Sequence, residues 1–91
     1  MAFVHLHNHT VFSMLDGATR IQDMVNRAVE LGMPAVAITD HGSMYGVVDF
    51  YREAKSQGIH PVIGCEVYMA LRSRFDKVHD IDNKTSHLIL L

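Results

Sequence analysis

The sequence predicts an α/β fold in which helices connect parallel strands, and two observations lead to this prediction. Two segments carry apolar residues at helical spacing, and each is followed by a glycine, a proline and an apolar run. The pattern also repeats, because Gly32 precedes Asp40 by eight residues and Gly58 precedes Glu66 by the same distance. Strands connected through helices run parallel, since each helix returns the chain to the starting edge of the sheet.

The first half of the chain is expected to hold two strands and a helix. Residues 3–6 alternate polar and apolar side chains, which is typical of a strand. A helix is predicted from near Thr19, which has capping-box spacing to Gln22, as far as Gly32. Its buried stripe would be Ile21, Met24, Val25, Ala28 and Val29. Residues 35–39 then form an apolar run that suits a strand buried on both faces.

The second half repeats this order and then departs from it. A helix is predicted over residues 44–57, with a buried stripe of Val47, Phe50, Tyr51 and Ala54. A strand follows over 62–68 and another over 86–91, and the charged residues 71–86 between them are expected to form a solvated loop. These elements make roughly three and a half βα units, whereas a closed barrel needs about 250 residues. We therefore expect residues 1–91 to be an N-terminal fragment of one domain, without a second domain.

Composition excludes several classes of function. A net charge of −2 argues against a basic surface that would bind nucleic acid without sequence preference. The single cysteine, Cys65, excludes a disulfide framework and fits a reducing compartment. No apolar run approaches the roughly 20 residues that span a bilayer, and no signal-peptide pattern is present. We expect a cytoplasmic protein that contacts no membrane.

Candidate metal ligands fall at the predicted strand ends, where the connecting loops of an α/β sheet converge. The first strand leads to His7 and His9, which lie two apart on an extended segment and can reach one centre. The second strand ends at Asp40 and His41, and the third ends near Glu66. Asp16 lies in the first loop, and His87 opens the last strand.

The chemistry of these side chains favours a divalent cation. Imidazole and carboxylate ligands together suit zinc or manganese. Taken alone, His7-x-His9 is a weak signal, and Asp40-His41-Gly42 is typical of a turn. Glu66 is more telling, because a carboxylate at the end of a buried strand is costly unless it is paired or binds an ion. One polar residue from each of several strand ends predicts a metal site.

Other candidates are expected to have structural roles. Cys65 alternates with Glu66 and should face the helices as part of the core. His5 shares a face with His7 and would either support the ligands or fill the interior. His60 and His79 are expected to be exposed to solvent.

Several motifs resemble those of the PHP (polymerase and histidinol phosphatase) family over essentially the whole chain. The segments are His7-Asn8-His9-Thr10, Leu15-Asp16-Gly17, Ile38-Thr39-Asp40-His41-Gly42 and Gly64-Cys65-Glu66. The resemblance is closer to the branch of the family found in bacterial replicative DNA polymerases. Segments 3–7, 13–17, 41–46 and 87–91 look like that branch.

The resemblance implies a distorted TIM-like β/α barrel of seven strands. It also implies up to three divalent ions, zinc or manganese with iron and magnesium as alternatives. The ligand positions matched in this chain are His7, His9, Asp16, His41, Glu66 and His87. Asp40 matches a position that would orient its neighbouring ligand. The family's later ligands, a Cys or His and an Asp-x-His, have no counterpart before Leu91.

The function implied by the resemblance is a metal-binding domain of a replicative DNA polymerase, whose partners would be DNA and other replisome subunits. The domain would support metal-dependent 3′–5′ hydrolysis of phosphodiesters, with a metal-bound water as nucleophile, or serve as a structural element. The fragment itself shows no direct nucleic-acid footprint. A stand-alone phosphoesterase, such as a histidinol phosphatase, is the first alternative. The second is a non-catalytic interaction module.

Overall fold

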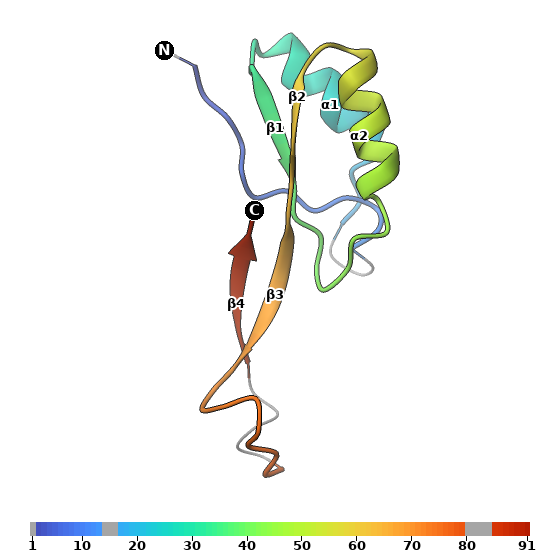
Figure 1. Ribbon diagram of the computed structural model, residues 1–91. Helices are drawn as coiled ribbons and strands as arrows, with labels where there is room; N and C mark the ends of the chain where they lie inside the picture. The colour runs from blue at the N-terminus through green and yellow to red at the C-terminus, as the bar shows by residue number, and fades with distance from the viewer. Residues whose placement is uncertain (1, 14–16, 80–84) are drawn as a thin grey trace.

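The computed structural model describes residues 2–13, 17–79 and 85–91. It contains two helices, α1 (Ile21–Glu30) and α2 (Val47–Ser56). The strands are β1 (Ala35–Ile38), β2 (His60–Ile63), β3 (Cys65–Ala70) and β4 (Thr85–Leu90). Both helices cover the same face of the β1–β2 pair, and the β3–β4 pair extends away from them (Figure 1). Within the described ranges no helix is long and apolar enough to cross a membrane.

The predicted parallel pairing is confirmed for β1 and β2, which align Ala35 with His60 and Ile38 with Ile63. The core lies between this sheet and the helices. It contains Val25 and Ala28 of α1, Val36 and Ile38 of β1, Phe50 and Ala54 of α2, and also Ile21 and Ile59. Of the predicted stripes, Met24 and Val47 are partly buried against this core. Val29 and Tyr51 do not belong to it, because they are 41% and 49% exposed.

The helix boundaries differ slightly from the prediction. The capping box is absent, because α1 begins after Arg20 and no side chain caps its first turn. Gly32 and Gly58 end the helical segments as expected, since both adopt the left-handed backbone, with φ of 74°. The predicted second helix loses its first turn, and residues 44–46 form a turn in which the amide of Val47 donates to the carbonyl of Met44.

The expected strand over residues 3–6 is not regular, although the segment lies beside β1. The amides of Ala37 and Thr39 donate to the carbonyls of His5 and Asn8. These donors are two residues apart and their acceptors three apart, so the pairing cannot continue as an even ladder. Asn8 fills the gap, because its Nδ2 donates to the Ala37 carbonyl at 2.9 Å.

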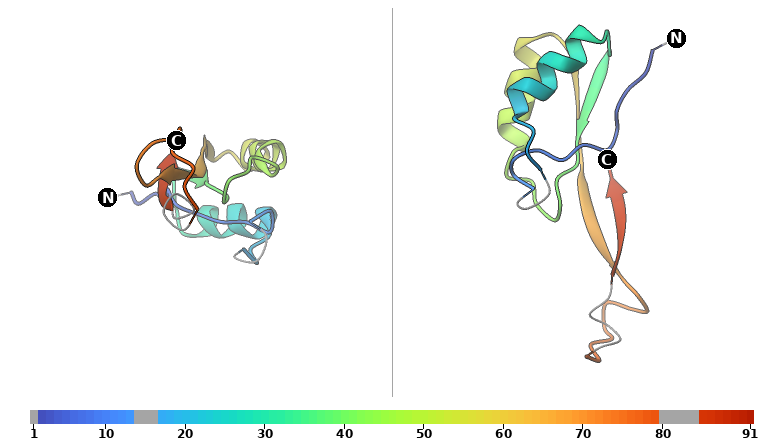
Figure 2. Two further views of the ribbon diagram at one scale, coloured as in Figure 1. Left: turned by 90° about the horizontal axis from the view of Figure 1, so that it is seen from below. Right: turned by 180° about the vertical axis from the view of Figure 1, so that it is seen from behind.

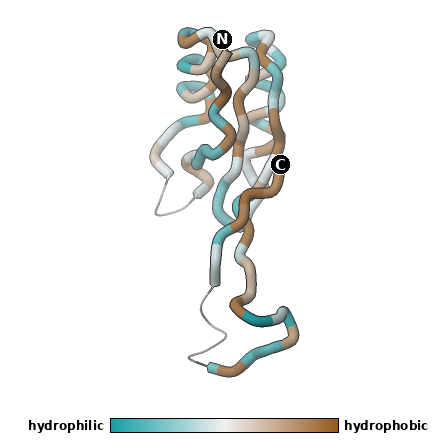
Figure 3. Tube along the Cα trace, turned by 90° about the vertical axis from the view of Figure 1, so that its left-hand side faces the viewer, coloured by the Kyte–Doolittle hydropathy of each residue, from teal (hydrophilic) through white to brown (hydrophobic). Residues whose placement is uncertain are grey.

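The prediction that all strands run parallel is wrong for β4, which pairs antiparallel with β3 from Cys65–Leu90 to Ala70–Thr85. Residues 71–79, the described part of the connection, contain no helix and are almost entirely exposed. Without a crossover helix the chain returns in the opposite direction. Figure 2 shows this hairpin projecting from the helical layer, and Figure 3 shows hydrophobic residues continuing along β4 to the C-terminus.

The predicted strand 62–68 is divided at Gly64, where the chain changes its pairing partner from β1 to β4. The amides of Gly64 and Glu66 still donate to the carbonyls of Ile38 and Asp40, so the alignment with the β1 segment extends past the break. A Cβ atom on Gly64 would lie 2.4 Å from the carbonyl oxygen of Leu90. Only glycine therefore allows this close approach of β4.

Candidate metal centre

Four histidines surround the carboxylate of Glu66, a β3 residue that is 3% exposed. Its Oε1 lies 2.7 Å from Nε2 of His7. Its Oε2 lies 3.5 Å from Nε2 of His9 and 3.2 Å from Nδ1 of His87. The same oxygen forms its closest contact with Nδ1 of His41. The structure thus brings together five of the six residues predicted as ligands.

Three backbone arrangements produce this cluster. His41 and Glu66 form an isolated parallel β-bridge just beyond β1, in which the amide of Gly42 donates to the carbonyl of Glu66. The antiparallel β3–β4 pair brings His87 alongside. The N-terminal segment, held to β1 through His5 and Asn8, supplies His7 and His9.

The histidines change the ionisation of Glu66. Burial raises the pKa of the carboxyl, but nearby His41 and His9 and a hydrogen bond from His7 lower it more. The pKa of Glu66 therefore lies below its ordinary value, so the carboxylate form is favoured. An ionised carboxylate that faces several imidazole nitrogens is a donor set that could hold a divalent metal ion.

Two groups of three side chains have the spacing needed to hold a cation: His7, His9 and Glu66, and His41, Glu66 and His87. In each group the candidate ligand atoms lie within 4.8 Å of one another. Oε2 of Glu66 is buried and receives no well-formed hydrogen bond from the described residues. Because a buried ionised carboxylate is costly unless its charge is compensated, this oxygen, which faces imidazole nitrogens, fits a metal ligand.

Asp40 lies beside the cluster but belongs to neither group. Its carboxylate accepts hydrogen bonds from the amide of Thr10 at 2.6 Å and from the hydroxyl of Ser13 at 2.8 Å. The Thr10 hydroxyl donates to the other oxygen at 2.8 Å. Ser13 Oγ in turn accepts from the amide of His41 at 2.9 Å. Asp40 thus connects the backbone beside His9 to the backbone of His41.

The roles of Thr10 and Ser13, two buried polar residues, were not predicted from the sequence. One signal was available, because Asp40 ends an apolar strand and a buried carboxylate needs hydrogen-bond donors. The hydroxyl residues nearest the first two histidines were the candidates for that role. Their hydrogen bonds explain why the loop after His9 lies against the end of β1.

The remaining candidates lie apart from the cluster. Asp16 falls outside the described residues. The ring of His5 packs edge-on against Phe3, with centroids 4.7 Å apart. His60 and His79 are exposed, as expected. Cys65 is only partly buried, and its Sγ lies 3.5 Å from the carbonyl oxygen of Ser43.

Comparison with known proteins places the chain in a family. The PHP domain family matches residues 5–91. The chain belongs to the PHP domain family.

Curated relatives of this PHP domain chain include DNA polymerase III subunit alpha from several bacteria. The chain is 46% identical to the protein of Chlamydia pneumoniae over 91 residues, which is 100% of this chain and 7% of that protein. It is 50% identical to the protein of Borreliella burgdorferi over 90 residues, which is 98% of this chain and 8% of that protein. The chain thus spans less than a tenth of the length of these relatives.

Two solved structures resemble this PHP domain chain in fold. An amidohydrolase from Chromobacterium violaceum has a TM-score of 0.73 and 26% identity, covering 97% of this chain and 27% of that one. A protein of Bifidobacterium adolescentis assigned as a metal-dependent phosphoesterase has a TM-score of 0.68 and 27% identity. That alignment covers 94% of this chain and 25% of the other.

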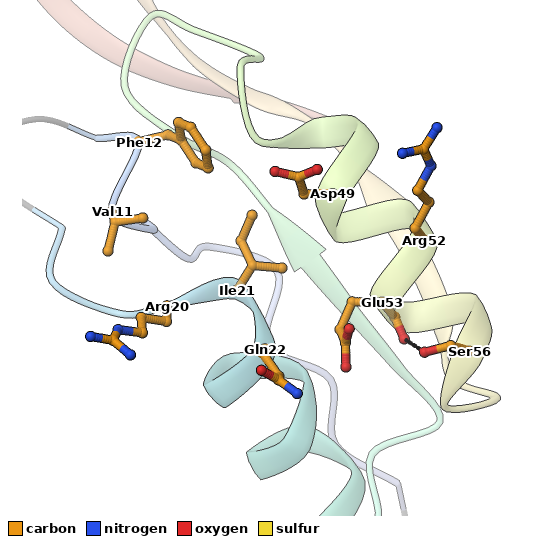
Figure 4. Close-up of a pocket in the computed structure, with 9 residues that line it drawn as sticks. All are labelled: Val11, Phe12, Arg20, Ile21, Gln22, Asp49, Arg52, Glu53 and Ser56. Atoms are coloured by element: carbon orange, nitrogen blue, oxygen red, sulfur yellow. Dashed lines mark hydrogen bonds between the residues drawn. The ribbon is translucent and has the colours of Figure 1, made fainter.

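A pocket of about 540 Å³ lies on the helical side of the PHP domain chain, and none of the candidate ligands lines it. Val11, Phe12 and Ile21 form its apolar wall, and polar side chains of α2 line the opposite side (Figure 4). Arg20 and Arg52 point away from each other, so they do not converge on one anion (Figure 4). Its lining does not offer the convergent polar groups of a catalytic site.

Proposed function

We propose that this chain supplies metal ligands to the PHP domain of a bacterial DNA polymerase III alpha subunit. One observation carries the proposal: the buried carboxylate of Glu66 lies among four imidazoles contributed by three separate segments. The identity of 46% to the Chlamydia pneumoniae protein supports the polymerase branch over other PHP proteins. DNA and other replisome subunits would then be partners of the parent protein, which we expect to act in the cytoplasm.

The proposed ligands are His7, His9, Asp16, His41, Glu66 and His87. Glu66 would be shared, with Oε1 directed to the His7 side and Oε2 to the side of His41 and His87. We propose zinc or manganese, in a complete PHP domain that holds up to three ions within a TIM-like barrel. Residues 1–91 would be an incomplete part of that domain.

The proposed chemistry is hydrolysis of a phosphodiester, including removal of nucleotides from a 3′ end. Bound divalent ions would supply an activated water and neutralise the phosphoryl oxygens. The protein's contribution is to hold the ligands in place: Glu66 remains ionised, and Asp40 fixes the backbone on either side of it through Thr10 and Ser13. The proposed chemistry requires no Ser or Cys nucleophile.

A stand-alone phosphoesterase is the second candidate function, because the Bifidobacterium adolescentis neighbour is assigned as a metal-dependent phosphoesterase. It would use the same ligands and differ in its substrate. A scaffold without catalysis is less well supported, since five candidate ligands already converge in the described residues.

The test combines metal analysis with two hydrolysis assays. Purified protein, loaded with Mn²⁺ or Zn²⁺, is given a single-stranded oligonucleotide or a small phosphate monoester. We expect 3′–5′ shortening of the oligonucleotide, and loss of both metal and activity in His7→Ala and Glu66→Ala. His60→Ala, an exposed histidine outside the cluster, is the matched control and should behave like the wild type.

Each outcome separates the candidates. Cleavage of the monoester alone would favour the stand-alone phosphoesterase. Bound metal without hydrolysis of either substrate would favour the scaffold. Hydrolysis that survived in metal-free Glu66→Ala would contradict a metalloenzyme.

A further inference from the structure

Tyr68 lies on the same face of β3 as Glu66, because residues two apart on a strand point to the same side. Directly across the β3–β4 pair, its partner is His87. Residues paired in this way on adjacent strands have neighbouring side chains. Neither composition nor motif spacing drew attention to Tyr68 as part of the site.

The ring of Tyr68 contacts both sides of the second group of candidate ligands. It meets the ring of His87 edge to face, with centroids 5.1 Å apart and an interplanar angle of 82°. It also packs against Gly42, where a Cβ atom would lie 3.1 Å from Cε2 of Tyr68. Gly42 directly follows His41, whose ring centroid is 5.5 Å from that of His87.

His87 is the most exposed candidate ligand of its group, so a contact that orders its ring has the largest effect there. Its side chain is 48% exposed, compared with 16% for His41 and 4% for Glu66. An exposed imidazole samples several rotamers, and ordering it on metal binding costs conformational entropy. An aromatic neighbour packed edge to face restricts those rotamers.

We propose that Tyr68 is a positioning residue that holds His87 beside His41 and Glu66 and thereby raises the metal affinity of this group. The inference rests on the proposed function, because it assigns Tyr68 a role within the same metal centre. Tyr68 acts through His87, and the ring rather than the hydroxyl carries the effect. Tyr68→Phe should therefore keep the function that Tyr68→Ala loses.

The test titrates Mn²⁺ and Zn²⁺ separately into metal-free purified protein and counts the ions bound. We expect Tyr68→Ala to weaken one binding step by roughly 2- to 13-fold, which corresponds to losing an edge-to-face aromatic contact. Tyr68→Phe should bind as the wild type does, and so should Tyr51→Ala, an exposed tyrosine of α2. In a His87→Ala background, Tyr68→Ala should cause no further loss, because the two residues act as a unit.

A pair of glycine variants tests the same contact without removing Tyr68. Gly42→Ala places a Cβ against the Tyr68 ring at a position with φ of 56°, whereas Gly58→Ala has φ of 74° and open space around it. Both variants bear the strain of the left-handed backbone, and the contact with the Tyr68 ring is made at Gly42 and not at Gly58. We expect Gly42→Ala to lose affinity at the same step and Gly58→Ala to retain it.

The inference and the proposed function fail in different ways. Wild-type protein that bound no metal would overturn the proposed function. Normal metal binding by wild type and by Tyr68→Ala alike would overturn the role of Tyr68 alone. If Tyr68→Ala did not fold, equal affinity of Gly42→Ala and Gly58→Ala would overturn it instead. Equal loss in the Tyr68→Ala and Tyr68→Phe variants would show that the ring contact is not the cause.

Discussion

The carboxylate of Asp40 accepts a 2.6 Å hydrogen bond from the backbone amide of Thr10. This contact joins the end of β1 to the segment that carries His7 and His9. It explains why an irregular N-terminal segment still delivers its histidines to Glu66. Residues 30 positions apart in the sequence are held together by one buried side chain.

We predict that Asp40→Ala destabilises the protein by at least about 2 kcal/mol, because the buried donors of Thr10 and Ser13 lose their acceptor. Urea unfolding monitored by circular dichroism would measure the change. Asp49→Ala is the matched control, since Asp49 is exposed in the first turn of α2 and should cost below about 1 kcal/mol. Equal losses in the two variants would show that the Asp40 hydrogen bonds do not hold the segment.

Glu66→Gln should remove metal binding while preserving the size of the side chain. The amide lacks the charge that a divalent cation requires, and both groups of candidate ligands include Glu66. We expect affinity to fall by at least about 100-fold for every ion, a larger loss than for a residue outside the ligand set. Metal analysis after dialysis measures this. Glu30→Gln, on the exposed side of α1, should retain the wild-type metal content.

Metal-free protein should lose stability on acidification in a way that depends on Glu66. Its pKa in the folded state lies below the unfolded value of 4.5, so ionisation of Glu66 stabilises the fold above that pH. This contribution disappears as the pH falls through the lower, folded-state pKa. The difference in unfolding free energy between wild type and Glu66→Gln should therefore shrink below pH 4.5. A difference that grew with acidification would contradict the direction of the shift.

Gly64→Ala should disturb the hairpin that carries His87. The new Cβ would lie 2.4 Å from the carbonyl oxygen of Leu90, and relieving such an overlap costs about 1–3 kcal/mol. Amide hydrogen exchange should become faster in β4 than in β1. Gly32→Ala, where nothing lies within 4 Å of the added Cβ, should leave exchange in β4 unchanged.

The helices and the β1–β2 pair were predictable because their signals are local. The apolar stripe of α1 and the left-handed turns at Gly32 and Gly58 depend on neighbouring residues. Exposure of Val29 and Tyr51 was not predictable, since helical spacing indicates a face but not how much of it a neighbour covers. The N-terminus of α1 was also predicted imprecisely. The expected capping box at Thr19 is absent, and the helix begins after Arg20.

The candidate ligands were predictable in kind, and only partly in arrangement. Strand-end placement indicated His7, His9, His41, Glu66 and His87, which the structure brings together. The predicted direction of β4 was wrong. His87 still reaches the cluster, because antiparallel pairing places it across from Tyr68. The roles of Thr10 and Ser13 depend on where a loop folds back, and no local pattern encodes that.

Two kinds of information therefore combine in this protein. Residue type and spacing by themselves determined the two helices, the buried strands and the imidazole and carboxylate groups at their ends, because periodicity and ligand chemistry act over short stretches of chain. The tertiary structure decided that Glu66 stands at the centre and that Asp40 joins Thr10 to His41 through Ser13. It also set β4 antiparallel. These relationships depend on hydrogen bonds and close packing between segments far apart in the sequence, which form only when the chain has folded.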